Sequence, residues 1–118
     1  MTAPLGKDAL LQAFIPTEDV QLPSGRGTVK VRGLTRWEAV ETQADVDEDT
    51  PAAQMLMERR ALARGLVEPQ LTEDEAEAWQ RSGLAADVAA VARRISELSN
   101  MDAAGGKGPT SPLRRTRR

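Results

Sequence analysis

The residues of this chain whose types and spacing could do chemistry are carboxylates, glycines and arginines in short clusters. Residues 45–49 (DVDED) place acids at alternate positions, like the opening of a calcium-binding loop. Such a loop requires glycine at its sixth position and a bidentate glutamate at its twelfth, where this chain has Thr50 and Leu56. We therefore interpret the segment as a solvated acidic connection.

Two further clusters have a chemical and a structural interpretation. Residues 73–77 (EDEAE) contain carboxylates of the kind used for general acid–base catalysis. Acids in the first turn of a helix are also what the helix dipole favours, and we prefer that interpretation. Residues 24–27 (SGRG) are rich in glycine but lack the spacing and the lysine of a phosphate-binding loop, which indicates a turn.

The chain has 118 residues and contains no histidine and no cysteine. This composition removes the commonest general base, the thiolate nucleophile and the usual zinc, haem and iron–sulfur ligands. An enzyme would have to work with Asp, Glu, Lys, Arg, Ser or Thr alone, and none of these forms a convincing catalytic cluster. We therefore expect a non-enzymatic protein with no cofactor and no metal.

The charge is polarised along the chain. Residues 1–102 hold 11 Lys and Arg against all 18 Asp and Glu, a net charge of −7, whereas residues 103–118 hold five basic residues and no acid, a charge of +5. Residues 103–118 have little to bury in a core, so we expect a disordered basic tail. Its arginines would attract phosphate backbones, and a small nucleic-acid-associated protein is the alternative function. The acidic body would repel nucleic acid.

Neither a signal peptide nor a membrane span is expected. Residues 1–6 have no basic start and no apolar run, and no stretch approaches the roughly 18 apolar residues that a transmembrane helix needs. We expect no membrane partner and a soluble protein in the cytoplasm.

The elements that must position these residues begin with an N-terminal arm, residues 1–17, whose apolar run either forms one turn of helix or docks on the domain. Residues 18–34 are typical of a β-hairpin, with a turn at 23–27 (PSGRG). Its apolar residues alternate with polar ones, which places them on one face: Val20, Leu22, Val29 and Val31. Two strands alone are marginally stable, so the hairpin must pack on helices or pair with another chain.

Helices are expected from Thr35 onward. Thr35 and Glu38 fit a capping box, after which three residues recur at helical spacing: Trp37, Val40 and Ala44. A second helix is expected to begin at Thr50-Pro51 and to run to about Arg64, with Gly65 at the position just past its end. Its inward residues are expected to be Met55, Leu56 and Leu62.

Two more helices follow. Thr72 and Glu75 repeat the capping box before a short helix that ends near residues 82–83. The last helix has the clearest apolar stripe of the chain: Leu84, Val88, Val91, Ile95 and Leu98. This stripe fits either an internal core face or a surface for a partner. The fold class is α+β, mainly α, with a hairpin and about four short helices forming one domain over residues 18–102.

The order of these elements resembles a known family. Residues 20–25 (VQLPSG) lead into 29–35 (VKVRGLT), Trp37-Glu38 follows, and later come 65–75 (GLVEPQLTEDE) and 95–99 (ISELS). Over residues 14–102 the chain resembles the tail assembly chaperones of long-tailed bacteriophages and related prophages.

This resemblance implies a non-catalytic protein of the host cytoplasm. Such chaperones bind the tape measure protein, an extended helix-rich chain, and help to recruit tail tube subunits. We expect the contacts on the hairpin (Val20, Leu22, Val29, Val31) and on the last helix (Leu84, Val88, Val91, Ile95).

The family also uses programmed ribosomal frameshifting, for which Gly105-Gly106-Lys107 is a candidate site, with an ordinary flexible tail as the alternative. The sequence leaves the oligomeric state open, including a homo-oligomer.

Overall fold

Five helices and three short antiparallel strands form the fold in the computed structural model, which describes residues 3–100. The predicted α+β, mainly α class is confirmed. In chain order the elements are α1 (Lys7–Leu11), β1 (Thr17–Gln21), β2 (Thr28–Arg32), α2 (Arg36–Thr42), α3 (Pro51–Gly65), β3 (Leu66–Glu68), α4 (Glu73–Ser82) and α5 (Ala85–Asn100). The predicted basic tail and the candidate frameshift site lie outside the described residues.

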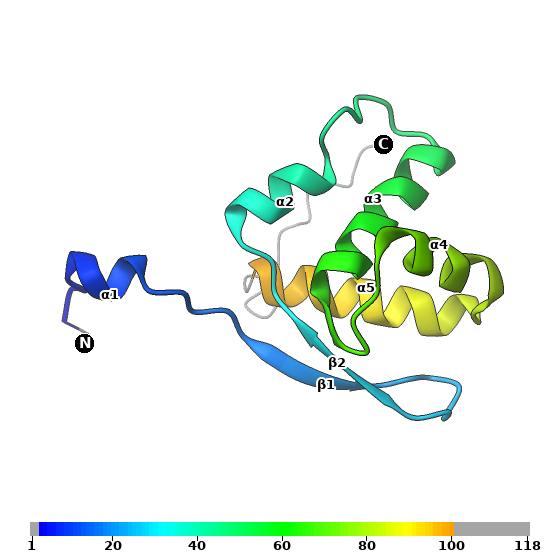
Figure 1. Ribbon diagram of the computed structural model, residues 1–118, viewed down its shortest axis with the longest axis horizontal. Helices are drawn as coiled ribbons and strands as arrows, with labels where there is room; N and C mark the ends of the chain where they lie inside the picture. The colour runs from blue at the N-terminus through cyan, green and yellow to red at the C-terminus, as the bar shows by residue number, and fades with distance from the viewer. Residues whose placement is uncertain (1–2, 101–118) are drawn as a thin grey trace, which may run out of the picture.

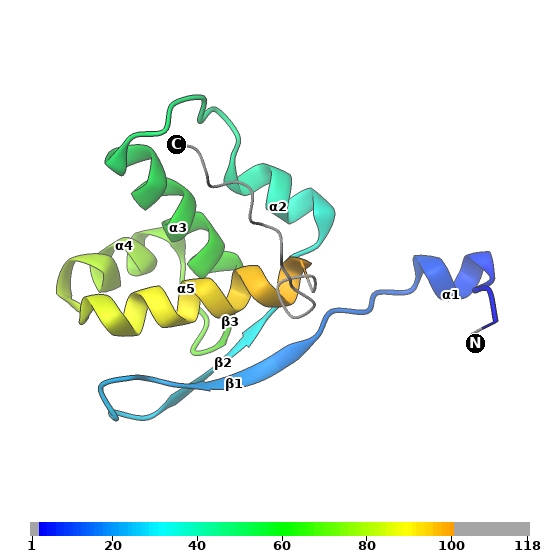
Figure 2. The same ribbon diagram turned by 180° about the vertical axis from the view of Figure 1, so that it is seen from behind.

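The predicted hairpin is present and gains a third strand. β1 pairs with β2 in the register Val20↔Val29, and β2 pairs on its other edge with β3, so that the sheet order is β1-β2-β3. Gly25 and Gly27 in the turn have φ values of +82° and +155°, which glycine tolerates far better than other residues. Figures 1 and 2 show the helices α2 to α5 on one side of the sheet.

The three helix starts predicted from capping residues are confirmed. The side chains of Thr35 and Thr72 each accept a hydrogen bond from the third residue of their helices, and both capping boxes close. Thr50 caps α3, with Pro51 at its first position. Capping satisfies backbone N–H groups that have no partner within a helix, which fixes where each helix begins.

The core lies between α5, α3 and the sheet. α5 supplies half of the buried apolar residues, and every other element from β2 onward except α2 supplies at least one: Val31, Leu62, Leu66, Ala76, Val88, Val91, Ile95 and Leu98. The stripe of the last helix is thus mainly an internal face. None of the helices within residues 3–100 has the length and apolar content needed to cross a bilayer.

Three details differ from the sequence-based expectation. Gly65 is the last residue of α3 rather than the residue beyond it, and Leu66 takes the cap position. β3 was not predicted, because three residues are too short to show an alternating pattern. Met55 was expected inward but is 42% exposed, since it lies in the first half of α3, away from the core residue Leu62.

Candidate protein-binding surface

The structure places four of the eight predicted contact residues in the core and three more against it. Val31, Val88, Val91 and Ile95 are at most 5% exposed, and Val20, Leu22 and Val29 are half-buried and pack against them. Leu84 precedes α5 and is the one member of the predicted set that is mostly exposed. In this folded state the set therefore stabilises the domain, and its role in partner binding stays a prediction.

A different apolar stripe faces outward, on α2. Trp37 is 76% exposed, Val40 is 49% exposed, and Ala44, just past the helix, is also exposed. The residues of α2 that face the body are instead polar or small, namely Glu38, Ala39 and Thr42. α2 is thus inverted relative to an ordinary surface helix, which turns its apolar face to the core.

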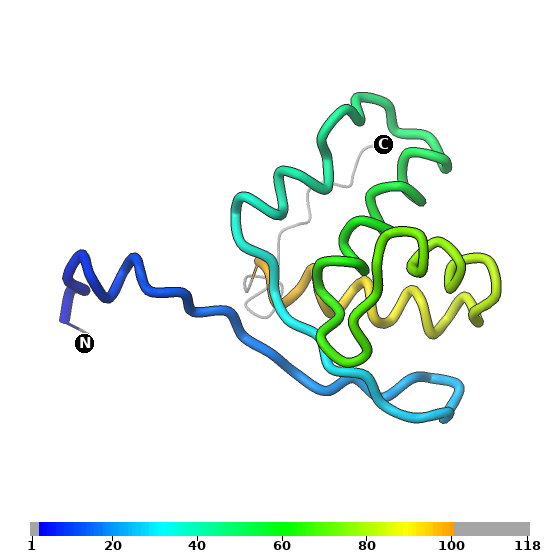
Figure 3. Tube along the Cα trace, viewed as in Figure 1, coloured from blue at the N-terminus to red at the C-terminus, as the bar shows by residue number. Residues whose placement is uncertain are grey.

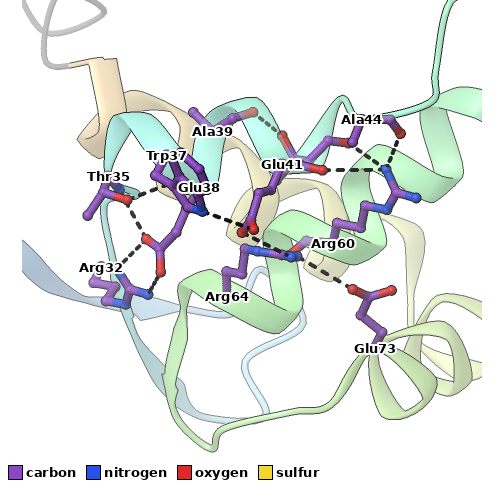
Figure 4. Close-up of polar contacts among 11 residues, drawn as sticks. Arg32, Thr35, Trp37, Glu38, Ala39, Glu41, Ala44, Arg60, Arg64 and Glu73 are labelled. Carbon is purple, nitrogen blue, oxygen red and sulfur yellow. Dashed lines mark hydrogen bonds and ion pairs between the residues drawn. The ribbon is translucent and has the colours of Figure 1, made fainter.

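The inner face of α2 is held by ion pairs and hydrogen bonds (Figure 4). Arg32 of β2 donates two hydrogen bonds to the carboxylate of Glu38, at 3.0 and 2.7 Å. The same carboxylate accepts a bond from the backbone N–H of Thr35, which closes the capping box. These contacts, the Arg32 hydrogen bond first among them, lower the pKa of Glu38 from 4.5 to about 2.

α3 fixes the other end of α2. Nη1 of Arg60 lies 2.7 Å from the carbonyl oxygen of Ala44 and 3.3 Å from that of Thr42. Carbonyls in the last turn of a helix lack partners within it, and a guanidinium there satisfies them and complements the helix dipole. One turn further along α3, Arg64 forms ion pairs at 3.5 Å with both Glu41 of α2 and Glu73 of α4.

The indole of Trp37 is oriented on the outer surface. Its Nε1 donates a hydrogen bond to Glu41, four residues on, at 3.1 Å (Figure 4). Glu41 is itself paired with Arg64, so a chain of polar contacts runs from α3 to the exposed ring. An aromatic ring whose polar atom is satisfied, while its apolar face stays uncovered, is suited to bind another apolar surface.

The acidic clusters considered as catalytic or metal-binding candidates lie at a helix start and in a connection between helices. Glu73, Asp74 and Glu75 lie in the first turn of α4, where the preferred structural interpretation put them. Residues 45–49 connect α2 to α3, and within residues 3–100 no group of three or more acidic residues is placed to hold a metal ion.

Sequence reasoning found the stripe of α2 but not its direction. Spacing alone cannot distinguish an apolar face that packs inward from one that faces water. The sequence does contain one sign of the direction, on the opposite face of the helix. That face holds Glu38, Ala39 and Thr42, so it has no large apolar side chain to bury against the body.

Comparison of the chain with protein-family models, with curated proteins and with solved structures finds no match.

Proposed function

We propose that the chain is a non-enzymatic tail assembly chaperone of a long-tailed phage. It binds helical segments of the tape measure protein in the host cytoplasm and helps to recruit tail tube subunits. The observation that carries the proposal is the inverted helix α2, which turns Trp37 and Val40 to solvent while its polar face is held against the body. An exposed apolar stripe is informative where a single exposed side chain is not.

The geometry of the stripe favours a helical partner. Trp37 and Val40 are three residues apart on α2, so they lie on the same face and form one short ridge, with the exposed Ala44 just past the end of the helix. A ridge of this kind packs into the groove between side-chain rows of another helix. A tape measure chain, long and rich in apolar helical positions, offers many such grooves.

The charges beside the ridge favour one orientation of the partner. Arg36 is exposed at the start of α2, and the acidic residues 45–49 follow its end. A partner helix with acidic residues near Arg36 and basic residues near 45–49 would form favourable charge contacts at both ends of α2, which would set its orientation. Because these charges are exposed, salt screens them, so we expect weaker binding at high ionic strength.

Each copy contributes a small contact, so affinity at one site should be modest. Central aromatic residues dominate small interfaces, and truncating one typically costs at least about 2 kcal/mol, roughly a thirtyfold loss of affinity. Many copies on one long chain would still cover it, which is the arrangement that chaperoning a tape measure protein requires.

The test is binding of the purified chain to the tape measure protein encoded beside it, measured by calorimetry. We expect Trp37→Ala to weaken binding about thirtyfold and Val40→Ser to weaken it less, in keeping with their areas. Met55→Ala is the matched control, since Met55 is also an exposed apolar residue but lies on α3. Equal affinity of Trp37→Ala and the unmodified protein would refute the assignment of this surface.

Deleting residues 109–118 separates the proposal from its alternative. A tail assembly chaperone that acts through α2 keeps its affinity for the tape measure protein after the deletion. If the shortened chain loses both that affinity and a salt-sensitive binding to DNA or RNA, the nucleic-acid-associated function is correct instead.

A further inference from the structure

The N-terminal arm, of which residues 3–16 are described ahead of β1, carries large apolar side chains that the rest of residues 3–100 leaves uncovered. The side chains are between 68% and 85% exposed: Leu5, Leu10, Leu11 and Phe14. α1, which holds two of them, has no buried residue. Exposing four such groups close together in sequence costs free energy unless something covers them.

The last residue of the arm, Pro16, continues the strand pairing of β1. The backbone N–H of Gly33 donates to the carbonyl of Pro16 at 2.9 Å, which extends the β1–β2 pairing by one step. Figures 1 and 3 show the arm running away from the body, at the end of the hairpin opposite its turn.

The other end of the hairpin forms one side of an apolar groove. A cavity of about 450 Å³ lies between the hairpin turn and α4, and its apolar wall comprises Leu22, Val29, Leu66, Leu71 and Trp79. Four of these side chains are half-buried and pack against the core, and Leu66 belongs to it. The wall is therefore the outer surface of a packed core and is formed before anything binds.

We infer that the N-terminal arm of one copy seats in this groove of a second copy. The arm supplies leucine and phenylalanine side chains, and the groove supplies an apolar wall of ordinary ligand-pocket size. The charges also match, since the arm carries Lys7 and Asp8 and the groove is lined by Glu75 and Arg26. The occupant is thus a second copy of this chain, bound through its arm.

The arm cannot easily reach the groove of its own chain. Residues 12–16, which connect α1 to β1, span at most about 17 Å when fully extended. β1 itself is about as long, so the connection would have to reverse and run straight back along the strand. A neighbouring copy receives the arm in the direction in which it already points.

Arm and groove are different surfaces at opposite ends of the hairpin, so the contact is heterologous. A contact of this kind leaves one arm and one groove unused at the two ends of any assembly, and it therefore builds open chains that lengthen with concentration. The inference concerns copies of this chain alone and does not rest on the proposed function.

The test measures the mass of the full chain by sedimentation equilibrium over a concentration series. We expect the average mass to rise with concentration for the unmodified protein. The arm variant Leu11→Ser/Phe14→Ser and the groove variant Ala78→Arg should each stay monomeric. Ala78 lines the groove but is exposed, so the arginine blocks the groove without entering the core. Ala86→Arg, an equal change at an exposed position in the first turn of α5, is the matched control and should associate normally.

Mixing the two monomeric variants gives the sharpest result. The arm variant keeps an intact groove and the groove variant keeps an intact arm, so the mixture should form a dimer that does not grow further. A monomeric mixture, or an unmodified protein that stays monomeric at every concentration, overturns the inference. So does association of Ala78→Arg alone at the level of the unmodified protein.

Discussion

The carboxylate of Asp87 accepts two hydrogen bonds from Ser24, one from its backbone N–H at 2.9 Å and one from its hydroxyl at 2.7 Å. Ser24 lies in the hairpin turn, and Asp87 lies in the first turn of α5, 63 residues later. Asp87 is only 1% exposed. The contact ties the tip of the hairpin to α5, and it also helps to hold one wall of the apolar groove.

Removing this carboxylate should destabilise the protein strongly. Asp87→Ala leaves both Ser24 donors without their acceptor and is expected to lower the free energy of unfolding by about 3 kcal/mol. Ser24→Ala loses only one of the two bonds and should cost about 1 kcal/mol. Urea denaturation measures both, with Asp74→Ala, an exposed acid in the first turn of α4, as the control. Equal costs for Asp87→Ala and Asp74→Ala would contradict the role of the contact.

The ion pair of Arg32 and Glu38 should make stability depend on pH in a defined window. The pKa of Glu38 is lowered from 4.5 to about 2, so the folded state favours the charged carboxylate. Its contribution is therefore fully present above pH 4.5 and is lost as the pH falls toward about 2. At pH 7 we expect Glu38→Gln to cost about 1 kcal/mol, because a partly exposed bidentate pair is worth about that much.

Because other groups also titrate in acid, the prediction concerns the difference in stability between the unmodified protein and Glu38→Gln. Urea midpoints of the unmodified protein and of Glu38→Gln should converge between pH 4.5 and about 2. Glu48→Gln, in the exposed loop after α2, should show no such convergence. A constant gap for Glu38→Gln over that range would show that its charge is not what stabilises the fold.

Arg60 should control the local stability of α2 rather than the global stability. Arg60→Met keeps the aliphatic stem but loses the bonds to the carbonyls at the end of α2. We expect hydrogen exchange of the α2 amides to speed up about tenfold, equivalent to about 1.4 kcal/mol. Arg59→Met, whose guanidinium contacts Gln80 and Glu77 of α4, is the matched control and should leave α2 unchanged. Equal acceleration by both variants would rule out capping by Arg60.

The local part of this fold was predictable from the sequence. Capping residues such as Thr35 and Thr72 specify helix starts through contacts within four residues, so no knowledge of the rest of the fold is needed. The alternation of Val20 and Leu22 with polar residues likewise predicts a strand face. Both patterns depend only on residues close together in the sequence, and the helix starts and the strand face that they predict are confirmed.

The candidate site was not predictable in the same way. The outward direction of Trp37 depends on Arg32, Arg60 and Arg64, which reach α2 from other elements. The sequence shows these arginines but not their partners. For the same reason periodicity left two interpretations of the α5 stripe, an internal core face and a partner surface, since it cannot reveal that β2 and α3 pack against its valines.

A glycine in α3 shows how closely that helix approaches α5. A Cβ atom placed on Gly65 would lie 2.6 Å from both Cδ1 and Cγ2 of Ile95, which is nearer than real side chains approach each other. Ile95 is 1% exposed and packed on all sides, so it has little room to move. Glycine is thus required at position 65 by contact rather than by a helix-ending conformation.

Gly65→Ala should therefore destabilise the protein although alanine favours helix. The gain in helix propensity is about 1 kcal/mol, and forcing a methyl group into a packed core costs about 1–3 kcal/mol, so we expect a net loss of stability in urea denaturation. Ile95→Ala removes the contacting atoms and should itself cost about 2–5 kcal/mol. In that background Gly65→Ala should become neutral or stabilising, because the new methyl group now has space. If Gly65→Ala costs the same in both backgrounds, the close approach to Ile95 is not the reason for glycine at this position.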